Sequence, residues 1–314
     1  MFDTKRSLRY HFVGIGGIGM SALAQIIKSL GHFVGGSDRR NDKKQTPEVF
    51  HKLVSQGIKL SPQDGTGVSK ETDFVVISSA VEEDNSDLRV ATQQNIQTIK
   101  RSDLLGSLFN NKHGIAIGGS NGKTTVCGMT SWILDEAGRD PTVVGGGYVK
   151  NFITDTSLGN SRFGRSETVV IEADESDGSL IKYMPKVSVI TNISKDHKTV
   201  EELGELFSKF AENTSDTVII NENCSPFMKI NNSSAKIITF GEGSSSDVCA
   251  SQVSCNPFGS RFKIKDNDFE INVPGLYNVY NALAAIAVAE TEGVSNLETK
   301  KALKTFKGTK RRME

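Results

Sequence analysis

The chain has 314 residues, a length that accommodates two domains of ordinary size, each able to bury a core without disulfides or metals. Lysine and arginine together number 37, as do aspartate and glutamate, so the formal net charge at pH 7 is zero. This balance argues against the basic surface that nucleic acid or an anionic membrane would require. We therefore expect small-molecule partners, no nucleic acid and no membrane.

Cysteine usage and the start of the chain indicate the compartment. The cysteines Cys127, Cys224, Cys249 and Cys255 have no CxxC spacing, which argues against a zinc site or a secreted disulfide framework. The sequence has no apolar run of membrane length, and its start, MFDTKRSLRYHFVGIGG, reaches a glycine loop without the apolar core of a signal peptide. We expect reduced thiols and a cytoplasmic protein, and we leave the oligomeric state open.

From residue 10 onward, short β-branched runs alternate with amphipathic stretches, a pattern typical of a parallel sheet wound by helices. One of these helices is expected to begin at Thr46 and Pro47, with the threonine as its cap and the proline in its first turn. We expect residues 1–111 to form a Rossmann-like domain. Its predicted strands are residues 10–13, 32–36 and 74–78, and its other helices are residues 18–30, 85–95 and 102–109.

A polar break at residues 110–114 is followed by a second strand, glycine loop and helix. We expect an α/β protein in which residues 112–314 form a second wound α/β domain with a phosphate-binding loop. Residues 247–273 alternate like an antiparallel hairpin, which we expect at the edge of the second sheet. The other predicted strands are residues 115–117, 168–172, 187–191, 217–220 and 236–240, and the helices are residues 123–137, 200–213, 278–290 and 296–305.

The most specific local pattern, GSNGKTT, follows the strand predicted at residues 115–117. A glycine turn at this place lets backbone N–H groups and a helix N-terminus converge on phosphate oxygens, while Lys123 supplies a cation and Thr124 a hydroxyl ligand for magnesium. The pattern GxxxxGK[ST] is incomplete because Ile117 stands in place of its first glycine, so the loop is a shorter variant, and a solvated turn is the alternative. The residues expected to bind ATP here are Gly119, Ser120, Asn121, Gly122, Lys123, Thr124 and Thr125.

Another glycine loop, GIGGIG, lies between a strand and a helix at residues 14–19. Such a loop admits a diphosphate against the backbone, and Asp38 at the end of the next strand suits a ribose-binding acid. NAD and a UDP-sugar both contain a diphosphate, so the loop does not separate these ligands, and glycines that serve only packing are the alternative. The glycines concerned are Gly14, Gly16, Gly17 and Gly19.

Acidic residues follow the apolar strand that ends at Glu172. Because ligands bind at the carboxyl ends of strands in a wound sheet, we expect Glu172 to serve magnesium on a nucleotide. Glu175 and Asp177 are expected in an exposed acidic turn. His197 follows a later strand end, where a surface histidine and a functional one are equally compatible with the pattern.

Eight segments, in order, resemble the Mur ligase family. They are HFVGIGGIGMSALA, GSD, VISSAVEEDN, GGSNGKTT, VIEADESDGS, TNISKDH, VPGLYNVYNALAAIAVA and FKGTKRRME, and they run over essentially the whole chain. The resemblance implies an ATP-dependent ligase of peptidoglycan precursor synthesis. In that reaction the lactyl carboxylate of UDP-N-acetylmuramate takes the γ-phosphoryl group of ATP, and the amine of L-alanine attacks the acyl phosphate to give an amide, ADP and phosphate.

The resemblance also implies roles for individual residues. The catalytic set is Lys123, Glu172 and His197, and the magnesium ligands are Thr124, Glu172 and His197. Beyond the phosphate loop, ATP is expected to contact Asn278 and Asn281 near adenine and Arg312 at the phosphates. The residues expected to hold the UDP-sugar are Gly14, Gly16, Gly17, Gly19, Asp38, Ser78 and Ser79.

The sequence departs from the family pattern in four places. The family usually has histidine at the positions of Asn121 and Tyr277, and Met-Asp or Leu-Asp where this chain has Lys198-Thr199. The family also continues past the RRxE-like segment into a third domain that supplies much of the amino-acid site, whereas this sequence ends at Glu314. From the last departure we expect the chain to lack that domain and to be inactive alone.

Other functions remain open on the sequence. An NAD-dependent oxidoreductase would use the first glycine loop but would leave GSNGKTT and EADESD without a role, and binding of NADH or of UDP-N-acetylmuramate separates the two possibilities. A non-catalytic nucleotide-binding homologue is a second alternative. A related Mur ligase that adds another amino acid or a recycled peptide is a third.

Overall fold

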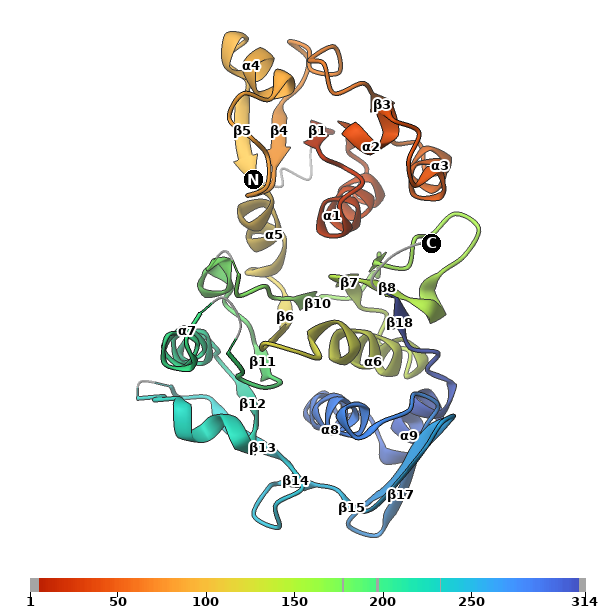
Figure 1. The fold of residues 1–314 in the computed structure, drawn as a ribbon, viewed down its shortest axis with the longest axis vertical. Coiled ribbons are helices and arrows are strands. Elements are labelled where there is room, and N and C mark those ends of the chain that lie inside the picture. Colours follow the sequence, from red (N-terminus) through yellow and green to blue (C-terminus); the bar gives the residue numbers. More distant parts are fainter. Residues whose placement is uncertain (1–5, 177, 196–197, 232, 311–314) are drawn as a thin grey trace.

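The computed structural model describes residues 6–176, 178–195, 198–231 and 233–310. It is an α/β structure with two large sheets, joined where α5 runs into β6 (Figure 1). The first sheet has five parallel strands in the order β3-β2-β1-β4-β5. These strands are β1 (Arg9–Val13), β2 (Phe33–Ser37), β3 (Lys59–Ser61), β4 (Phe74–Ile77) and β5 (Gln97–Lys100).

Four helices lie between the strands of the first sheet, and a fifth, α5, leads to the second large sheet. They are α1 (Ile18–Ser29), α2 (Arg39–Asp42), α3 (Pro47–Ser55), α4 (Ser86–Gln93) and α5 (Arg101–Phe109). The buried side chains of β1, such as Phe12, pack in one core with Leu23 and Ile27 of α1, so the amphipathic face expected from the sequence is the face that the sheet covers. The Asn85 side chain caps α4 by accepting hydrogen bonds from two backbone N–H groups.

The start of α3 differs from the prediction. Pro47 occupies the first turn as expected, but Thr46 has a left-handed backbone with φ 47°, and its side chain makes no capping hydrogen bond with any residue that the structure describes. A threonine with this backbone is not in the extended conformation that a capping residue usually adopts. The helix therefore begins through the fixed φ of its proline rather than through a side-chain cap.

The second large sheet has eight strands in the order β14-β13-β12-β11-β6-β10-β7-β9. Among the described strands, every neighbouring pair in this sheet is parallel except β7 and β9, which are antiparallel. The strands are β6 (His113–Gly118), β7 (Thr142–Val144), β9 (Ser161–Arg162), β10 (Thr168–Glu172), β11 (Val187–Ile190), β12 (Thr217–Asn221), β13 (Lys236–Gly241) and β14 (Val248–Cys249).

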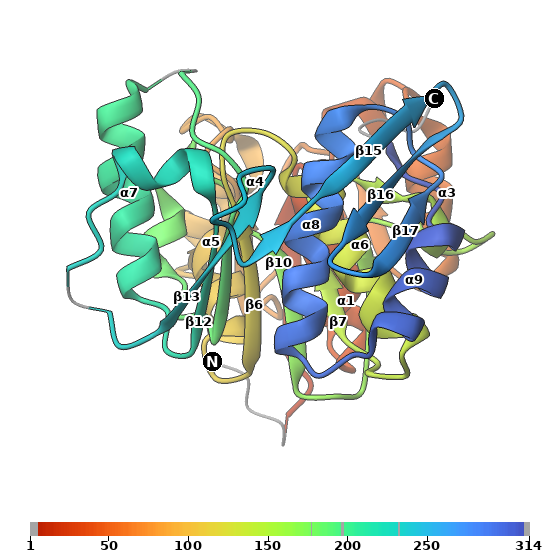
Figure 2. The same ribbon diagram turned by 90° about the horizontal axis from the view of Figure 1, so that it is seen from below.

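Helices cover both faces of this sheet. Helix α7 packs on one side, and α6, α8 and α9 pack together on the other (Figure 2). The helices are α6 (Lys123–Glu136), α7 (Val200–Glu212), α8 (Leu276–Thr291) and α9 (Asn296–Thr305), with 3-10 turns η1 (Lys150–Phe152), η2 (Ser179–Lys182) and η3 (Glu222–Phe227). The described residues contain no helix with the length and apolar character needed to cross a lipid bilayer.

The antiparallel segment does not lie where the sequence predicted. Strands β15 (Ser251–Asn256), β16 (Gly259–Ile264) and β17 (Asn267–Ile271) form a separate three-stranded sheet instead of extending the edge of the large one. Phe262 and Phe269 on its inner face are buried together with α8 and α9. The segment therefore buries its apolar face against helices, and the two-residue strand β14 forms the edge of the large sheet.

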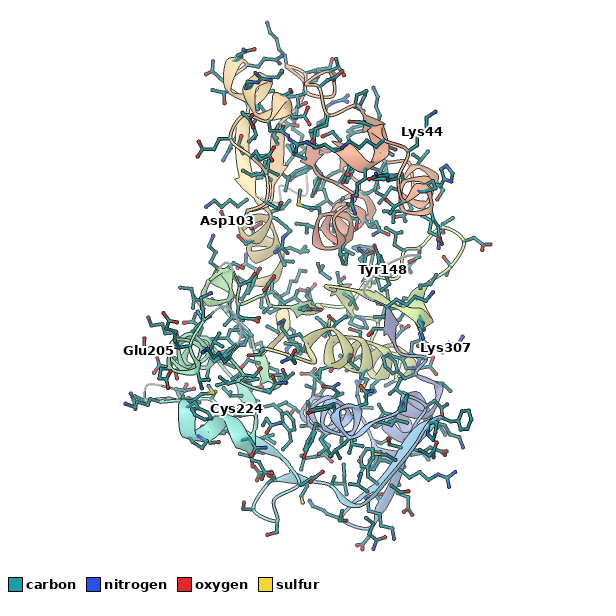
Figure 3. The ribbon with its side chains drawn as sticks, in the orientation of Figure 1. Lys44, Asp103, Tyr148, Glu205, Cys224 and Lys307 are labelled. Atoms are coloured by element: carbon teal, nitrogen blue, oxygen red, sulfur yellow. The ribbon has the colours of Figure 1, made fainter. Side chains whose placement is uncertain are left out.

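The two large sheets lie one above the other, with polar and apolar contacts at the junction. Tyr148 in strand β8 (Tyr148–Val149), which pairs with β18 (Thr309–Lys310), is 3% exposed and lies at this junction (Figure 3). Asp103 of α5 forms an ion pair with Lys182 of η2, and Asn110 donates to the carbonyl oxygen of Lys182. The junction brings the glycine loop after β1 close to the carboxyl ends of β7 and β10.

Candidate functional site

The loop between β6 and α6 requires glycine at two positions. Gly119 has φ +127° and Gly122 has φ +84°, values in the range that side chains rarely adopt. A Cβ atom on Gly119 would lie 2.1 Å from Thr191 Oγ1, and one on Gly122 would lie 2.4 Å from Asn281 Oδ1. The loop is thus closely packed against β11 and α8, and its backbone turns into the N-terminus of α6.

Residues that follow β11 hold this loop in place by hydrogen bonds. Thr191 Oγ1 donates to the Asn121 carbonyl oxygen at 2.6 Å, and the Asn121 N–H donates to Asn192 Oδ1 at 3.0 Å. The hydroxyl of Ser120 donates to the carbonyl oxygen of Ser194 at 3.1 Å, and the Asn121 side chain donates to Ser194 Oγ at 3.0 Å. Asn121, where the resembling family usually has histidine, therefore helps to fix the loop.

Lys123 lies in the first turn of α6 and points back into the loop. Its Nζ is 2.8 Å from Glu175 Oε2 and donates to the Gly119 carbonyl oxygen at 2.7 Å. The side chains of Lys123 and Glu175 are 14% and 12% exposed. The prediction that Glu175 lies in an exposed turn is therefore wrong, because the carboxylate folds inward onto the lysine; Asp177 lies outside the described residues.

Glu172 ends β10 next to the first turn of α6. Its Oε1 accepts from Thr124 Oγ1 at 3.0 Å, and its Oε2 accepts from the Gly146 N–H at 2.9 Å. Burial raises the pKa of Glu172, against the opposing effects of these two hydrogen bonds and of the charge on Lys123. A Cβ on Gly146 would lie 2.6 Å from the Glu172 carboxyl carbon, so this glycine leaves room for the carboxylate.

Thr124 and Glu172 provide two oxygen ligands of the kind that magnesium uses. No group of three or more His, Cys, Asp or Glu side chains within the described ranges converges on one point. Magnesium on a nucleotide usually takes one or two protein oxygens and fills its other positions with phosphate oxygens and water. The hydroxyl and carboxylate 3.0 Å apart fit such an ion.

A cavity of about 830 Å³ opens beside the phosphate loop. Asn121, Gly122 and Thr125 line it from the loop side, and Tyr277 and Asn281 line it from α8. Asn281 thus lies at the cavity, and its contact with adenine stays a prediction. Asn278 lies behind it, because its Oδ1 accepts a hydrogen bond from Asn281 Nδ2 at 3.1 Å and its own amide donates to the Pro274 carbonyl oxygen.

The first glycine loop turns between β1 and α1. Gly14 has φ +73°, and the Gly16 N–H donates to Asp38 Oδ2 at 2.9 Å. The other carboxylate oxygen of Asp38 accepts from the Arg40 N–H at 2.9 Å and caps α2. Asp38 is 5% exposed and holds the loop in this structure, so its assignment to a ribose stays a prediction.

A second cavity, of about 320 Å³, lies between the two large sheets. Its lining from the side of the first sheet includes Gly17, Gly19 and Ser78. Its lining from the side of the second sheet includes Gly146 and Glu172. Its walls therefore bring the first glycine loop to the carboxylate that contacts the phosphate loop. Ser79 is exposed and does not belong to the described lining of this cavity.

Arg101 and Asp174 also line the second cavity; Asp174 belongs to the acidic run that follows Glu172, and neither residue was among the predicted site residues. A Cβ on Gly19 would lie 3.1 Å from an Arg101 guanidinium nitrogen, so this cation lies against the first turn of α1. Arg101 directly follows β5, and its place at a strand end was the signal; it was overlooked because β5, with the sequence QTIK, was not predicted. His197 and Arg312, both predicted site residues, lie outside the described residues.

Comparisons with known proteins agree with this architecture. The profile described as "Mur ligase family, catalytic domain" matches residues 9–113, and that described as "Mur ligase middle domain" matches residues 117–289. A UDP-N-acetylmuramate--L-alanine ligase of Hydrogenobaculum sp. is 40% identical, with 98% of this chain and 68% of that protein covered. The ligase of the same name from Aquifex aeolicus is 38% identical, with 99% and 69% covered.

Solved structures show the same fold. The UDP-N-acetylmuramate-alanine ligase of Thermotoga maritima superposes with a TM-score of 0.82 at 29% identity, over 97% of this chain and 70% of that one. A UDP-N-acetylmuramate:L-alanyl-gamma-D-glutamyl-meso-diaminopimelate ligase from Neisseria meningitides superposes with a TM-score of 0.83 at 23% identity, over 98% and 100%. The profile matches and these relatives establish that the chain belongs to the Mur ligase family.

Proposed function

We propose that this chain carries the nucleotide sites of an ATP-dependent ligase that joins L-alanine to UDP-N-acetylmuramate. The observation that carries the proposal is the position of Glu172, which contacts Thr124 of the phosphate loop and also lines the cavity that the first glycine loop faces. One carboxylate thus adjoins both sites. The names of the relatives at 40% and 38% identity supply the identity of the substrates.

The reaction follows from the chemistry of a carboxylate. An oxygen of the lactyl carboxylate attacks the γ-phosphorus of ATP, the bond from that phosphorus to the β,γ-bridging oxygen breaks, and ADP leaves. The amine of alanine then attacks the acyl carbon, the carbon–oxygen bond to phosphate breaks, and the amine loses a proton as the amide forms. The protein contributes mainly positioning and neutralisation of charge on the transferred group.

The phosphate loop at the second large sheet has the groups that ATP requires. The N-terminus of α6, the glycine turn and Lys123 provide N–H groups and a cation for the β- and γ-phosphates. The 830 Å³ cavity next to them, with Asn281 on its wall, has room for the base and ribose. Thr124 and Glu172 would hold magnesium, which when bound supplies charge neutralisation on the phosphates; the predicted roles of His197 and Arg312 remain part of the proposal.

The glycine loop at the first large sheet has the groups that a UDP-sugar requires. Gly17 and Gly19 allow a diphosphate to approach the N-terminus of α1, and Arg101 adds a positive charge at the same place. A sugar nucleotide bound there would extend its carboxylate toward Glu172 and the phosphate loop. We propose that residues 1–111 and 112–314 are the two domains that carry these sites, and that the protein acts in the cytoplasm, where ATP and UDP-sugars are available.

Calorimetric titration tests the phosphate loop. ATP with magnesium is expected to bind one site on the wild-type protein, and Lys123→Ala is expected to weaken binding about 100-fold, because charge-assisted hydrogen bonds contribute about 1.5–3 kcal/mol each and about 1.4 kcal/mol is tenfold. Lys209→Ala, which removes an exposed lysine of α7, serves as the control and should bind like wild type. Equal ATP affinity of Lys123→Ala and wild type would contradict the assignment.

A further inference from the structure

Helix α1 follows the first glycine loop, and it also packs against the second large sheet. Its contacts there are with β7 and the short antiparallel strand β9. Asn160, which directly precedes β9, is 1% exposed at this contact. An amide buried between two domains is costly unless its donors and acceptor are all engaged.

The Asn160 side chain makes three hydrogen bonds to α1. Its Nδ2 donates to the Ile18 carbonyl oxygen at 2.8 Å and to Ser21 Oγ at 2.9 Å. Its Oδ1 accepts from Gln25 Nε2 at 2.9 Å. These partners are 135 to 142 residues away in the chain, and all three lie on the helix whose N-terminus forms the sugar-nucleotide loop.

The backbone of Asn160 is connected to the other half of the cleft. Its carbonyl oxygen accepts from the Gly145 N–H at 2.9 Å. The next residue, Gly146, donates its N–H to Glu172 Oε2 at 2.9 Å. A continuous series of short contacts therefore runs from the start of α1 through Asn160 to the carboxylate at the phosphate loop.

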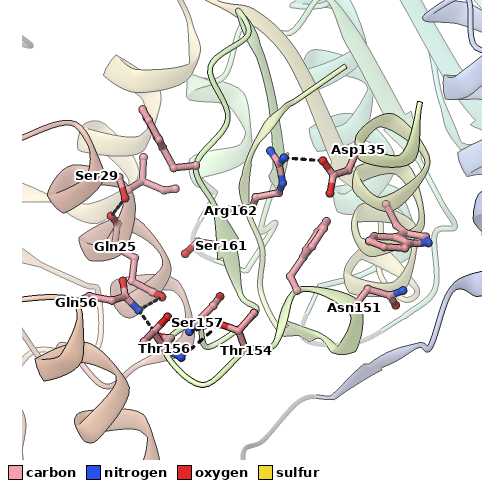
Figure 4. Close-up of a pocket in the computed structure, with 14 residues that line it drawn as sticks. Gln25, Ser29, Gln56, Asp135, Asn151, Thr154, Thr156, Ser157, Ser161 and Arg162 are labelled. Atoms are coloured by element: carbon pink, nitrogen blue, oxygen red, sulfur yellow. Dashed lines mark hydrogen bonds and ion pairs between the residues drawn. The ribbon is translucent and has the colours of Figure 1, made fainter. Parts of the chain in front are cut away.

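Neighbouring contacts hold the segment before Asn160 against the first sheet. Gln56 Nε2 donates to the Thr156 carbonyl oxygen at 2.7 Å, and Lys52 Nζ donates to the Thr154 carbonyl oxygen at 2.9 Å. Figure 4 shows Gln25 and Gln56 facing Thr156 across this junction, beside a cavity of about 370 Å³. These hydrogen bonds act together with apolar contacts at the same junction, where Val144 and Leu158 belong to one buried cluster with Ile26 of α1, and they give the position of the two parts a direction that apolar contact alone does not specify.

We propose that Asn160 is a positioning residue for the ligase reaction, one that sets the distance between the sugar-nucleotide loop and the phosphate loop without touching either nucleotide. The inference rests on the proposed function, because it requires that one substrate extend across the cleft. A ligand that touches only the first loop needs no alignment of the two halves. A ligand whose carboxylate must also reach Glu172 needs both halves in register.

Comparison of a short and a long ligand tests this role. UDP contacts only the first loop, whereas UDP-N-acetylmuramate spans the cleft, so the ratio of their dissociation constants reports alignment. Asn160→Ala is expected to weaken UDP-N-acetylmuramate about tenfold, the factor that corresponds to about 1.4 kcal/mol, and to leave UDP within about twofold of wild type. Asn151→Ala is the matched control, because its amide bonds residues 305 and 307 instead of α1.

A second variant keeps the test decisive if Asn160→Ala does not fold. Ser21→Ala removes one acceptor of the Asn160 amide and leaves the other two contacts in place, and it should change the ligand ratio in the same direction by a smaller factor. An unchanged ratio in the folded variant, or an equal loss for both ligands, would overturn the positioning role. Failure of the wild-type protein to bind UDP-N-acetylmuramate would instead reject the proposed function.

Discussion

Glu175 pairs with Lys123, the residue that we propose contacts a phosphate of ATP, so replacement of Glu175 should strengthen nucleotide binding. The two side chains are mostly buried, and Lys123 Nζ lies 2.8 Å from Glu175 Oε2 and donates a hydrogen bond to Oε1 at 3.1 Å. A hydrogen bond between charged groups contributes about 1.5–3 kcal/mol and a neutral one about 0.5–1.5 kcal/mol. Glu175→Gln keeps a neutral acceptor for Lys123, but the interaction that competes with phosphate becomes weaker by roughly 1 kcal/mol. ATP should therefore bind about fivefold tighter.

Calorimetric titration of magnesium-ATP into wild-type protein, Glu175→Gln and Glu205→Gln measures this effect. Glu205 projects from α7, away from the loop (Figure 3), and its replacement makes the same change of charge without touching Lys123. Tighter binding in Glu175→Gln alone is expected, together with a small loss in the free energy of unfolding without nucleotide. Unchanged or weaker binding in Glu175→Gln would refute the view that Glu175 competes with phosphate.

Three further predictions concern the metal site and pH. Glu172→Gln should weaken the magnesium dependence of ATP binding, because it removes an anionic ligand. An unaltered magnesium titration would show that Glu172 does not bind the ion. Gly146→Ala should have a similar effect, because its Cβ would displace the Glu172 carboxylate, and retention of the wild-type magnesium midpoint would contradict this. Burial acts to raise the pKa of Asp87, but hydrogen bonds from His11, Ser37 and the Gly65 N–H hold it below its usual value. Stability from this lowered pKa is present above the unfolded value of about 3.9 and is lost as pH falls through the folded pKa, so denaturation at about pH 6 and about pH 3 should show a smaller pH dependence for Asp87→Asn than for wild type.

The strands and helices with strong periodicity could be predicted from the sequence. Residues 10–13, 168–172 and 187–191 are apolar runs between glycine-rich or polar turns, and the structure has β1, β10 and β11 there. Strands β3 and β5 were missed because their sequences, KLS and QTIK, contain no apolar run, and β7 was missed because it has only three residues. So short a run has too few alternations to distinguish a strand from a loop.

The hairpin position and the burial of Glu175 depend on contacts that local sequence does not encode. Alternation in residues 247–273 predicts strands correctly, but the partner of their apolar face is α8 and α9, which follow later in the chain. Glu175 belongs to an acidic run that is typical of a surface turn, and Lys123, 52 residues earlier, draws it inward. Asn160 has no local signal at all, since each of its side-chain partners lies more than 130 residues away.

Two different nucleotides are expected to bind this protein at the same time, one on each glycine loop. The most direct test is a titration of UDP-N-acetylmuramate into protein already saturated with magnesium and a non-hydrolysable ATP analogue, with NADH as a competitor. One equivalent of UDP-N-acetylmuramate should bind beside one equivalent of the analogue, and NADH should displace neither. Mutual exclusion of the two nucleotides, or displacement of UDP-N-acetylmuramate by NADH, would contradict it.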